Sequence, residues 1–211
     1  MPPPKAKVLM LHGRNSNKTV AEFQAIILQL DTMADCSTLD APHVTGQKFD
    51  KDMEGEGRSW EGPDGDVRTG LELVVEHCKK HGPFDVAYGF SQGCSVITML
   101  SDAGVLKALG VETPLWKSVV CVCGTGYLIT KQTQLPVVEP AAVALPSFHL
   151  HGATDNILPE SKALLTLFER PHVVTHPWGH AVPMALLTTD APLVEPLRAF
   201  VKAPSHGAAA S

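Results

Sequence analysis

The stretch Gly89-Phe90-Ser91-Gln92-Gly93 follows an apolar run, Phe84–Tyr88, that is typical of a β-strand. The residues after it, Cys94–Leu100, predict a helix. A G-x-S-x-G sequence between a strand and a helix is typical of a nucleophile elbow, a sharp turn that exposes a serine hydroxyl at the end of a sheet. The two glycines have no Cβ atom, so the strand and helix backbones can pass close together around a strained serine. The stretch therefore predicts nucleophilic catalysis by Ser91.

Strand and helix patterns alternate along the rest of the chain, which predicts an α/β fold with a mostly parallel central sheet and helices on both faces. Further strands are expected over short apolar runs: Lys7–Leu11, Cys36–Ala41, Val119–Cys123, Ser147–His151 and His172–His176. Further helices are expected where apolar residues recur with helical spacing: Thr19–Leu30, Val67–His81, Glu160–Glu169 and Ala191–Lys202. On the first of these helices, the spacing predicts one apolar face of Val20, Phe23, Ile26, Ile27 and Leu30. On the second, it predicts an inward face of Leu71, Val74, Val75 and Cys78.

The 211 residues suit one α/β domain, which we expect over residues 1–202. The remaining residues, 203–211, are rich in Ala and Ser and are expected to form a frayed tail. Two segments, His43–Asp66 and Gly124–Pro146, are longer than ordinary connections. Long segments of this kind often form lids or pocket walls, and neither is large enough to be a separate cap domain.

The formal net charge of −5 is small, and the 17 basic residues form no dense cluster. Nucleic acid and anionic membrane surfaces both require concentrated positive charge, so neither is an expected partner. No apolar run approaches the roughly 18 residues that are needed to span a bilayer. The first residues also lack the apolar region of a secretion signal.

The five cysteines are an odd number and have no spacing typical of a disulfide framework. They fit free, buried thiols in a reducing compartment, so a cytoplasmic location is expected. Cys121 and Cys123 lie in one strand-like run, where alternation predicts that both thiols point to the same face. Packing in the core, rather than redox chemistry, is the expected role of this pair.

Two loops after later strands supply an acid and a base for Ser91. Asp155 lies in His151–Pro159, after one predicted strand, and His180 lies in His176–Pro183, after the next. In a parallel sheet the loops after the strands project from the same carboxyl edge. The order serine, acid, histidine is that of an α/β-hydrolase. In this interpretation His180 removes the proton from Ser91, while Asp155 orients the imidazole and stabilises its protonated form.

Each of these residues also has an ordinary explanation. An Asp in a turn commonly caps its own backbone, and a loop His commonly has no chemical role. The occurrence of all three residues in order, each after a strand, favours the catalytic triad. The chain also has ten histidines, including His149 and His151 on one strand and His172 and His176 on the next. Since neither C-x-x-C nor H-E-x-x-H spacing occurs, no metal site is expected.

An acyl-transfer site also needs two N–H groups that bind the oxyanion. One is expected from Gln92, directly after the nucleophile, and the other from Arg14, in the turn after the first strand. Gly124-Thr125-Gly126 follows a strand as a dinucleotide-binding loop would, but Ile129 occupies the place of the third glycine. No cofactor is therefore expected.

With these residues the chain resembles the FSH family of serine hydrolases, a group of α/β-hydrolases. The resemblance covers nearly the whole chain, from Lys5 to Lys202, and rests on a combination of short motifs. These are L-H-G at 11–13, D-A-P at 40–42, R-x-W at 58–60, G-P-F-D and G-F-S-Q-G within 82–93, H-G-x-x-D-x-x-x-P at 151–159 and G-H-x-x-P at 179–183. The resemblance implies a compact hydrolase without a large cap that acts on carboxylic esters or thioesters. It also implies that Ser91, Asp155 and His180 form the triad.

The expected activity is cofactor-independent cleavage of a small-molecule ester or thioester with a short to medium acyl chain. Four residues are expected to wall the acyl pocket: Trp60, Tyr127, Leu128 and Trp178. Two alternatives remain open: a transferase that hands the same acyl group to an alcohol or amine, and a ligand-binding protein on a hydrolase fold. The sequence does not indicate an oligomeric state.

Overall fold

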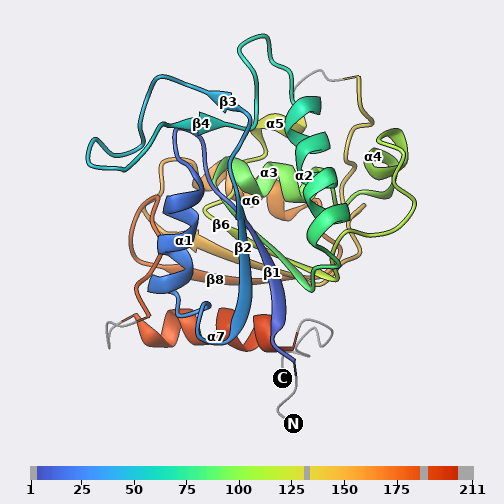
Figure 1. Ribbon diagram of the computed structural model, residues 1–211. Helices are drawn as coiled ribbons and strands as arrows, with labels where there is room; N and C mark the ends of the chain where they lie inside the picture. Colours follow the sequence, from blue (N-terminus) through green and yellow to red (C-terminus); the bar gives the residue numbers. More distant parts are fainter. Residues whose placement is uncertain (1–3, 131–133, 186–189, 204–211) are drawn as a thin grey trace.

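The computed structural model describes residues 4–130, 134–185 and 190–203 (Figure 1). Its centre is a six-stranded sheet in the order β2-β1-β5-β6-β7-β8, in which all neighbouring strands are parallel. These strands are β1 (Ala6–Leu11), β2 (Ala34–Leu39), β5 (Val86–Phe90), β6 (Ser118–Val122), β7 (Ser147–Gly152) and β8 (Pro171–His176). The shorter β3 (His43–Val44) and β4 (Arg58–Ser59) form an antiparallel pair outside this sheet. The mostly parallel sheet predicted from the sequence is confirmed.

Helices pack on both faces of the sheet (Figure 1). On one face, buried side chains come from α1 (Lys18–Ile27) and α7 (Ala191–Lys202). On the other face they come from α2 (Arg68–His81), α3 (Gln92–Met99), α4 (Ala103–Ala108), α5 (Tyr127–Thr130) and α6 (Leu158–Leu165). Alternate residues of the central strands point into the two cores, as expected for parallel strands that are buried on both sides.

The apolar face predicted from the sequence is fully buried on α2 but only partly buried on α1. The four apolar residues predicted on α2 are all buried. On α1, Phe23 is 57% exposed and Ile26 is 52% exposed. Ile27 and Leu30 of the predicted face are buried, and the helix also buries Ala21, Gln24 and Ala25. Small side chains allow the helix to lie close to the sheet, so the face chosen by packing is rotated from the one with the largest apolar residues.

The two thiols of the Cys121–Cys123 run also depart from the prediction. Cys121 packs in the core that contains α3, whereas Cys123 packs in the core that contains α1. The reason is that β6 ends at Val122, and Cys123 has a φ of 46°, outside the range of a strand. Strand alternation therefore does not extend to Cys123, and the expectation that both thiols share a face is wrong.

Several short elements are not predicted by the alternating patterns. They are β3 and β4, which lie within the segment treated as a long loop, together with α4 and α5. None exceeds six residues, so too few positions are available to establish a period. The start of α4 does have a local signal, because the side chain of Asp102 accepts a hydrogen bond from the Val105 N–H over 2.9 Å.

None of the described helices is both long enough and apolar enough to cross a membrane. Of the predicted tail, 203–211, only Ala203 belongs to the described residues.

Candidate active site

Ser91 lies on a strained turn between β5 and α3. Its φ of 52° and ψ of −117° are unusual for a residue with a side chain, and strain of this kind is often found at functional sites. A Cβ atom on Gly93 would lie 2.4 Å from the Leu11 carbonyl oxygen, and one on Gly89 would lie 2.7 Å from the Cys94 nitrogen. The close approach of these backbones therefore requires both glycines, for the reason that the sequence suggests.

The structure brings the predicted acid and base together. Nδ1 of His180 lies 2.8 Å from Oδ2 of Asp155, a distance at which the ring N–H donates a hydrogen bond to the carboxylate. The other carboxylate oxygen, Oδ1, accepts a hydrogen bond from the Ile157 N–H over 2.9 Å. The Asp155 side chain is 1% exposed and that of His180 is 24% exposed, so the acid is buried while the base reaches the surface. The His180 ring lies 5.0 Å from that of Phe90, which directly precedes Ser91.

All three residues of the predicted triad lie at the carboxyl edge of the sheet. Ser91 follows β5, Asp155 follows β7 and His180 follows β8. Since β6 lies between β5 and β7, the residue after β6 lies between the nucleophile and the acid. That residue is Cys123, to which the sequence assigns no functional role. The Ser91 N–H donates to the carbonyl of Val122 over 3.0 Å, which fixes the end of β6 against the elbow.

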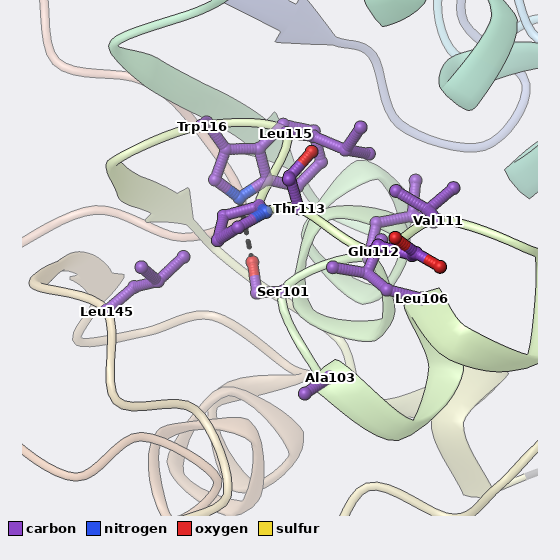
Figure 2. A pocket seen from close by; sticks show the side chains of 11 residues that line it. Ser101, Ala103, Leu106, Val111, Glu112, Thr113, Leu115, Trp116 and Leu145 are labelled. Atoms are coloured by element: carbon purple, nitrogen blue, oxygen red, sulfur yellow. Dashed lines mark hydrogen bonds between the residues drawn. The ribbon is translucent and has the colours of Figure 1, made fainter.

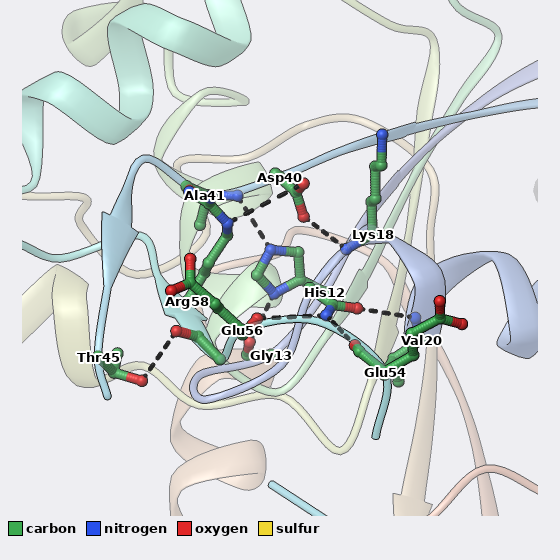
Figure 3. A network of polar contacts seen from close by, with 12 residues as sticks. His12, Gly13, Lys18, Val20, Asp40, Ala41, Thr45, Glu54, Glu56 and Arg58 are labelled. Atoms are coloured by element: carbon green, nitrogen blue, oxygen red, sulfur yellow. Dashed lines mark hydrogen bonds and ion pairs between the residues drawn. The ribbon is translucent and has the colours of Figure 1, made fainter. Parts of the chain in front are cut away.

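The turn after β1 packs against the nucleophile, where the second oxyanion N–H is predicted. A Cβ atom on Gly13 would lie only 3.0 Å from Cβ of Ser91. In the buried His12 ring, Nδ1 lies 2.7 Å from the Gly13 carbonyl and Nε2 lies 3.0 Å from the Ala41 nitrogen (Figure 3). Because the Ala41 N–H can only donate, Nε2 accepts and Nδ1 donates. Burial lowers the pKa of His12 to about 4, so the ring is neutral near pH 7. The next residue after the glycine is Arg14, whose side chain is exposed.

The residue after the nucleophile is held by β4 and the tryptophan that follows it. Oε1 of Gln92 accepts hydrogen bonds from the Trp60 N–H over 3.0 Å and from the Ser59 hydroxyl over 3.2 Å. The Trp60 indole donates from Nε1 to the His12 carbonyl over 2.8 Å. Trp60 therefore joins the Gln92 side chain to the turn after β1, and so links the two segments that carry the predicted oxyanion donors.

The R-x-W motif at 58–60 thus has a structural explanation. Arg58 donates from Nη1 to the Ala41 carbonyl over 3.1 Å, and its Nε lies 4.0 Å from the Asp40 carboxylate (Figure 3). Ala41 is also the residue whose N–H donates to the His12 ring. Arg58 is therefore linked to the His12 ring through Ala41, while the indole of Trp60 binds the His12 carbonyl directly. The sequence gives no separate signal for the roles of His12 and Ser59, because both depend on contacts between distant segments.

The four residues predicted to wall the pocket separate into two pairs. Trp60 and Leu128 have no exposed surface and belong to the core, so neither lines an open pocket and the prediction is corrected for both. Trp60 is buried where its backbone N–H donates to the Gln92 side chain and its indole donates to the His12 carbonyl. Tyr127 is 43% exposed and Trp178 is 38% exposed, and they follow β6 and β8 at the edge that holds Ser91.

Among the described residues, one group of possible metal ligands lies close together: Cys123, Asp155 and His180. Two of its members are the predicted acid and base. Histidines on the neighbouring strands β7 and β8 do not form a further group of this kind within the described part of the chain.

An apolar pocket of about 110 Å³ lies between α4 and the segments that lead into β6 and β7 (Figure 2). Trp116 lines this pocket and donates from Nε1 to the Ser101 hydroxyl over 2.8 Å. Trp116 and Leu145 precede β6 and β7, so the pocket lies at the amino edge of the sheet. It is therefore separate from the candidate active site at the carboxyl edge.

Comparison with known proteins identifies relatives of the chain. A family model described as "Serine hydrolase (FSH1)" matches residues 1–191. Esterase AGAP003155 of Anopheles gambiae is 31% identical over 199 residues, which cover 85% of this chain and 72% of that protein. Esterase OVCA2 of Bos taurus is 32% identical over 121 residues, which cover 56% of this chain and 52% of that protein. The chain thus spans only about half the length of this bovine relative.

Solved structures show the same fold at low sequence identity. A predicted CIB-like hydrolase from Thermoplasma acidophilum superposes with a TM-score of 0.63 and 13% identity, over 96% of this chain and 88% of that one. Acyl-protein thioesterase 2 of Zea mays superposes with a TM-score of 0.58 and 16% identity, over 94% of each chain. These likenesses establish the α/β-hydrolase fold. Because the family match covers most of the chain, the chain belongs to the FSH1 family of serine hydrolases.

Proposed function

We propose that the protein is a serine esterase that cleaves a carboxylic ester or thioester through an acyl-enzyme on Ser91. The observation that carries this proposal is the 2.8 Å contact between Asp155 and His180, at the same sheet edge as the strained turn of Ser91. A buried carboxylate next to a partly exposed imidazole is the arrangement that a serine nucleophile requires. The esterase relatives and the family membership support the same reaction class.

In the proposed reaction, the Ser91 hydroxyl attacks the carbonyl carbon of the substrate while Nε2 of His180 accepts its proton. Asp155 stabilises the imidazolium that forms. As the tetrahedral intermediate collapses, His180 donates this proton to the leaving oxygen or sulfur, and the acyl group stays on Ser91. Water then attacks the acyl-enzyme, His180 accepts the proton of that water, and the carboxylic acid is released. None of these steps needs a cofactor.

The N–H groups of Gln92 and Arg14 are the proposed donors to the oxyanion. Support comes from the packing around them: the turn before Arg14 touches Ser91 through Gly13, and Trp60 ties that turn to the Gln92 side chain. Donors held in this way need little reorganisation when charge develops on the substrate oxygen.

Tyr127 and Trp178 are the proposed pocket residues, because both have exposed aromatic surface beside strand ends of the active edge. The group that they would contact is, in this proposal, a short to medium acyl chain. Thioesters and oxygen esters are both proposed as substrates, since both leave the same acyl-enzyme.

The test is kcat/KM for a matched panel of acyl chains, each offered as an oxygen ester and as a CoA thioester, with Ser91→Ala beside the wild type. Serine-dependent turnover with an optimum in chain length is expected. Repeating the reaction with an added alcohol or amine separates hydrolysis from acyl transfer, because only a transferase yields the new ester or amide as the main product. Activity retained in Ser91→Ala would contradict the proposal.

A further inference from the structure

A buried thiol lies against the proposed acid and base. Sγ of Cys123, a carboxylate oxygen of Asp155 and a ring nitrogen of His180 all lie within 4.8 Å of one another. Cys123 has no exposed surface, and the Asp155 side chain is 1% exposed. A buried carboxylate is stable only when polar groups surround it. The thiol therefore adds a polar contact to those from His180 and the Ile157 N–H.

The same sulfur also contacts the loop that carries the base. It lies 3.5 Å from the Ala181 carbonyl and 4.0 Å from the Gly179 carbonyl, which flank His180 on either side. Nε2 of His176 lies 3.9 Å away. A thiol is a weak donor with a single proton. Cys123 therefore makes weak contacts with both the loop that carries Asp155 and the loop that carries His180, rather than a strong hydrogen bond to either one.

The backbone at Cys123 directs the side chain to this place. Its φ of 46° lies in the left-handed region that favours glycine, and its N–H donates to the Leu150 carbonyl of β7 over 2.9 Å. A residue with a side chain in this region is strained, and such strain is often found at functional positions. The turn moves Cys123 away from the core that holds Cys121.

The thiol is a donor and not a second nucleophile. Burial, followed by the nearby Asp155 charge, raises the pKa of Cys123 to about 12. The group therefore stays protonated near neutral pH, where a thiol is unreactive but can still donate a hydrogen bond. Among the described residues, the titratable groups His151 of β7 and His176 of β8 also lie near Asp155, and Asp190 lies near His176. Burial lowers the pKa of both imidazoles.

From these contacts we propose that Cys123 is a positioning residue, whose thiol holds the Asp155–His180 pair in place relative to Ser91. The proposal rests on the proposed function, because it assigns Cys123 a role only through those three residues. The order of the strands supports this role. The carboxyl ends of β5, β6, β7 and β8 lie side by side, and they are followed in turn by Ser91, Cys123, Asp155 and His180.

The test measures the rate constant for covalent labelling of Ser91 by a fluorophosphonate across the neutral pH range. Cys123→Ala and Cys123→Gly are expected to label about 2- to 10-fold more slowly, as for the loss of one modest hydrogen bond. The pH midpoint of labelling is expected to move upward, because the Asp155 carboxylate loses a nearby donor. Cys123→Ser keeps a donor and is expected to restore most of the rate and the original midpoint. The glycine variant suits the left-handed backbone, so it provides a folded protein should alanine be poorly tolerated.

Cys78→Ala is the matched control. Cys78 is a buried thiol on α2, and burial alone raises its pKa to about 12. Its removal is expected to leave the labelling rate and midpoint unchanged. Unchanged labelling in Cys123→Gly would overturn the positioning role alone. A slower labelling rate in Cys123→Gly would also overturn it under three conditions together: the slowing matches a loss of thermal stability, the pH midpoint of labelling stays unchanged, and Cys123→Ser does not restore the rate. A wild-type protein that is not labelled at Ser91 would overturn the proposed function, and the positioning role with it.

Discussion

Nδ1 of His180 lies 2.8 Å from Oδ2 of Asp155, and the carboxylate that it contacts is almost completely buried. A solvent-exposed ion pair would hold the orientation of the imidazole ring only weakly, because solvent screens the charges. In this buried position the carboxylate selects the tautomer of the ring. The proton on Nδ1 leaves Nε2 free to accept a proton, as the proposed general-base role of His180 requires.

Asp155→Asn tests this relationship. The amide keeps the size of the side chain but removes the charge that stabilises the imidazolium in the proposed reaction, so kcat is expected to fall by about 10³- to 10⁴-fold. Steady-state kinetics measure the loss, and circular dichroism checks the fold. Asp85→Asn is a suitable control, because Asp85 pairs with Lys117 over 2.7 Å before the start of β5, far from the triad. A fall in kcat of equal size in both variants would contradict the catalytic role.

The bridge made by Trp60 gives a second prediction. Trp60→Phe removes the Nε1–H that donates to the His12 carbonyl and leaves a buried acceptor without this partner. The free energy of unfolding is expected to fall by about 1–3 kcal/mol. The kcat is expected to fall by about 10- to 100-fold, because the turn before Arg14 is no longer tied to Gln92. Chemical denaturation and steady-state kinetics measure the two effects.

Trp116→Phe separates these effects. Trp116 is also buried and also donates from its indole, to the Ser101 hydroxyl, but it lies at the amino edge of the sheet. A similar loss of stability with unchanged kcat is expected. If both variants lost the same activity, the bridge would have no special link to the active site.

The third prediction concerns the glycines of the elbow. A Cβ atom on Gly93 would meet the Leu11 carbonyl at 2.4 Å, which is backbone that cannot move aside. Gly93→Ala is therefore expected to lower the free energy of unfolding by about 1–3 kcal/mol or more. Gly126→Ala is the comparison, since a Cβ there meets nothing within 4 Å. That variant is expected to be neutral or more stable by up to about 1 kcal/mol. Urea unfolding of both proteins decides the matter, and equal stabilities would refute the steric argument.

The features that the sequence predicts correctly are those set by local rules. The strained turn at Ser91, the inward face of α2 and the parallel sheet each follow from spacing or from residue type over a few positions. The meeting of Asp155 and His180 also follows, because strand order in a parallel sheet places successive loops at one edge.

The features that it misses depend on contacts between distant segments. The alanines of α1 face the sheet although Phe23 is larger and more apolar, because close packing rather than hydrophobicity sets the rotation. The sequence predicts that Trp60 lines a pocket, but its indole donates a hydrogen bond to the His12 carbonyl, 48 residues away in the chain. The sequence predicts that Cys123 continues a strand, and only its positive φ shows that the chain turns there, toward Asp155.

The fourth prediction concerns the dependence of stability on pH. His149 has no exposed surface, and neither of its ring nitrogens has a hydrogen-bond partner among the described residues. Burial lowers its pKa from 6.5 to about 3. Above pH 6.5 the ring is neutral in both the folded and the unfolded states, so it adds no pH dependence. Between pH 6.5 and about 3 only the unfolded state binds the proton, so stability falls as the pH falls, by at most about 1.4 kcal/mol per pH unit.

His149→Leu removes this proton-binding group and replaces it with an apolar side chain of similar size. The unfolding free energy of the variant is expected to fall less steeply than that of the wild type as the pH is lowered from 6.5, with no such difference above it. Urea unfolding at a series of pH values measures the two slopes. The exposed His172 on the adjacent strand provides the control, and His172→Leu is expected to keep the wild-type slope. Parallel curves for His149→Leu and the wild type would show that the buried ring becomes charged, or gains a partner, without the cost that its apolar surroundings imply.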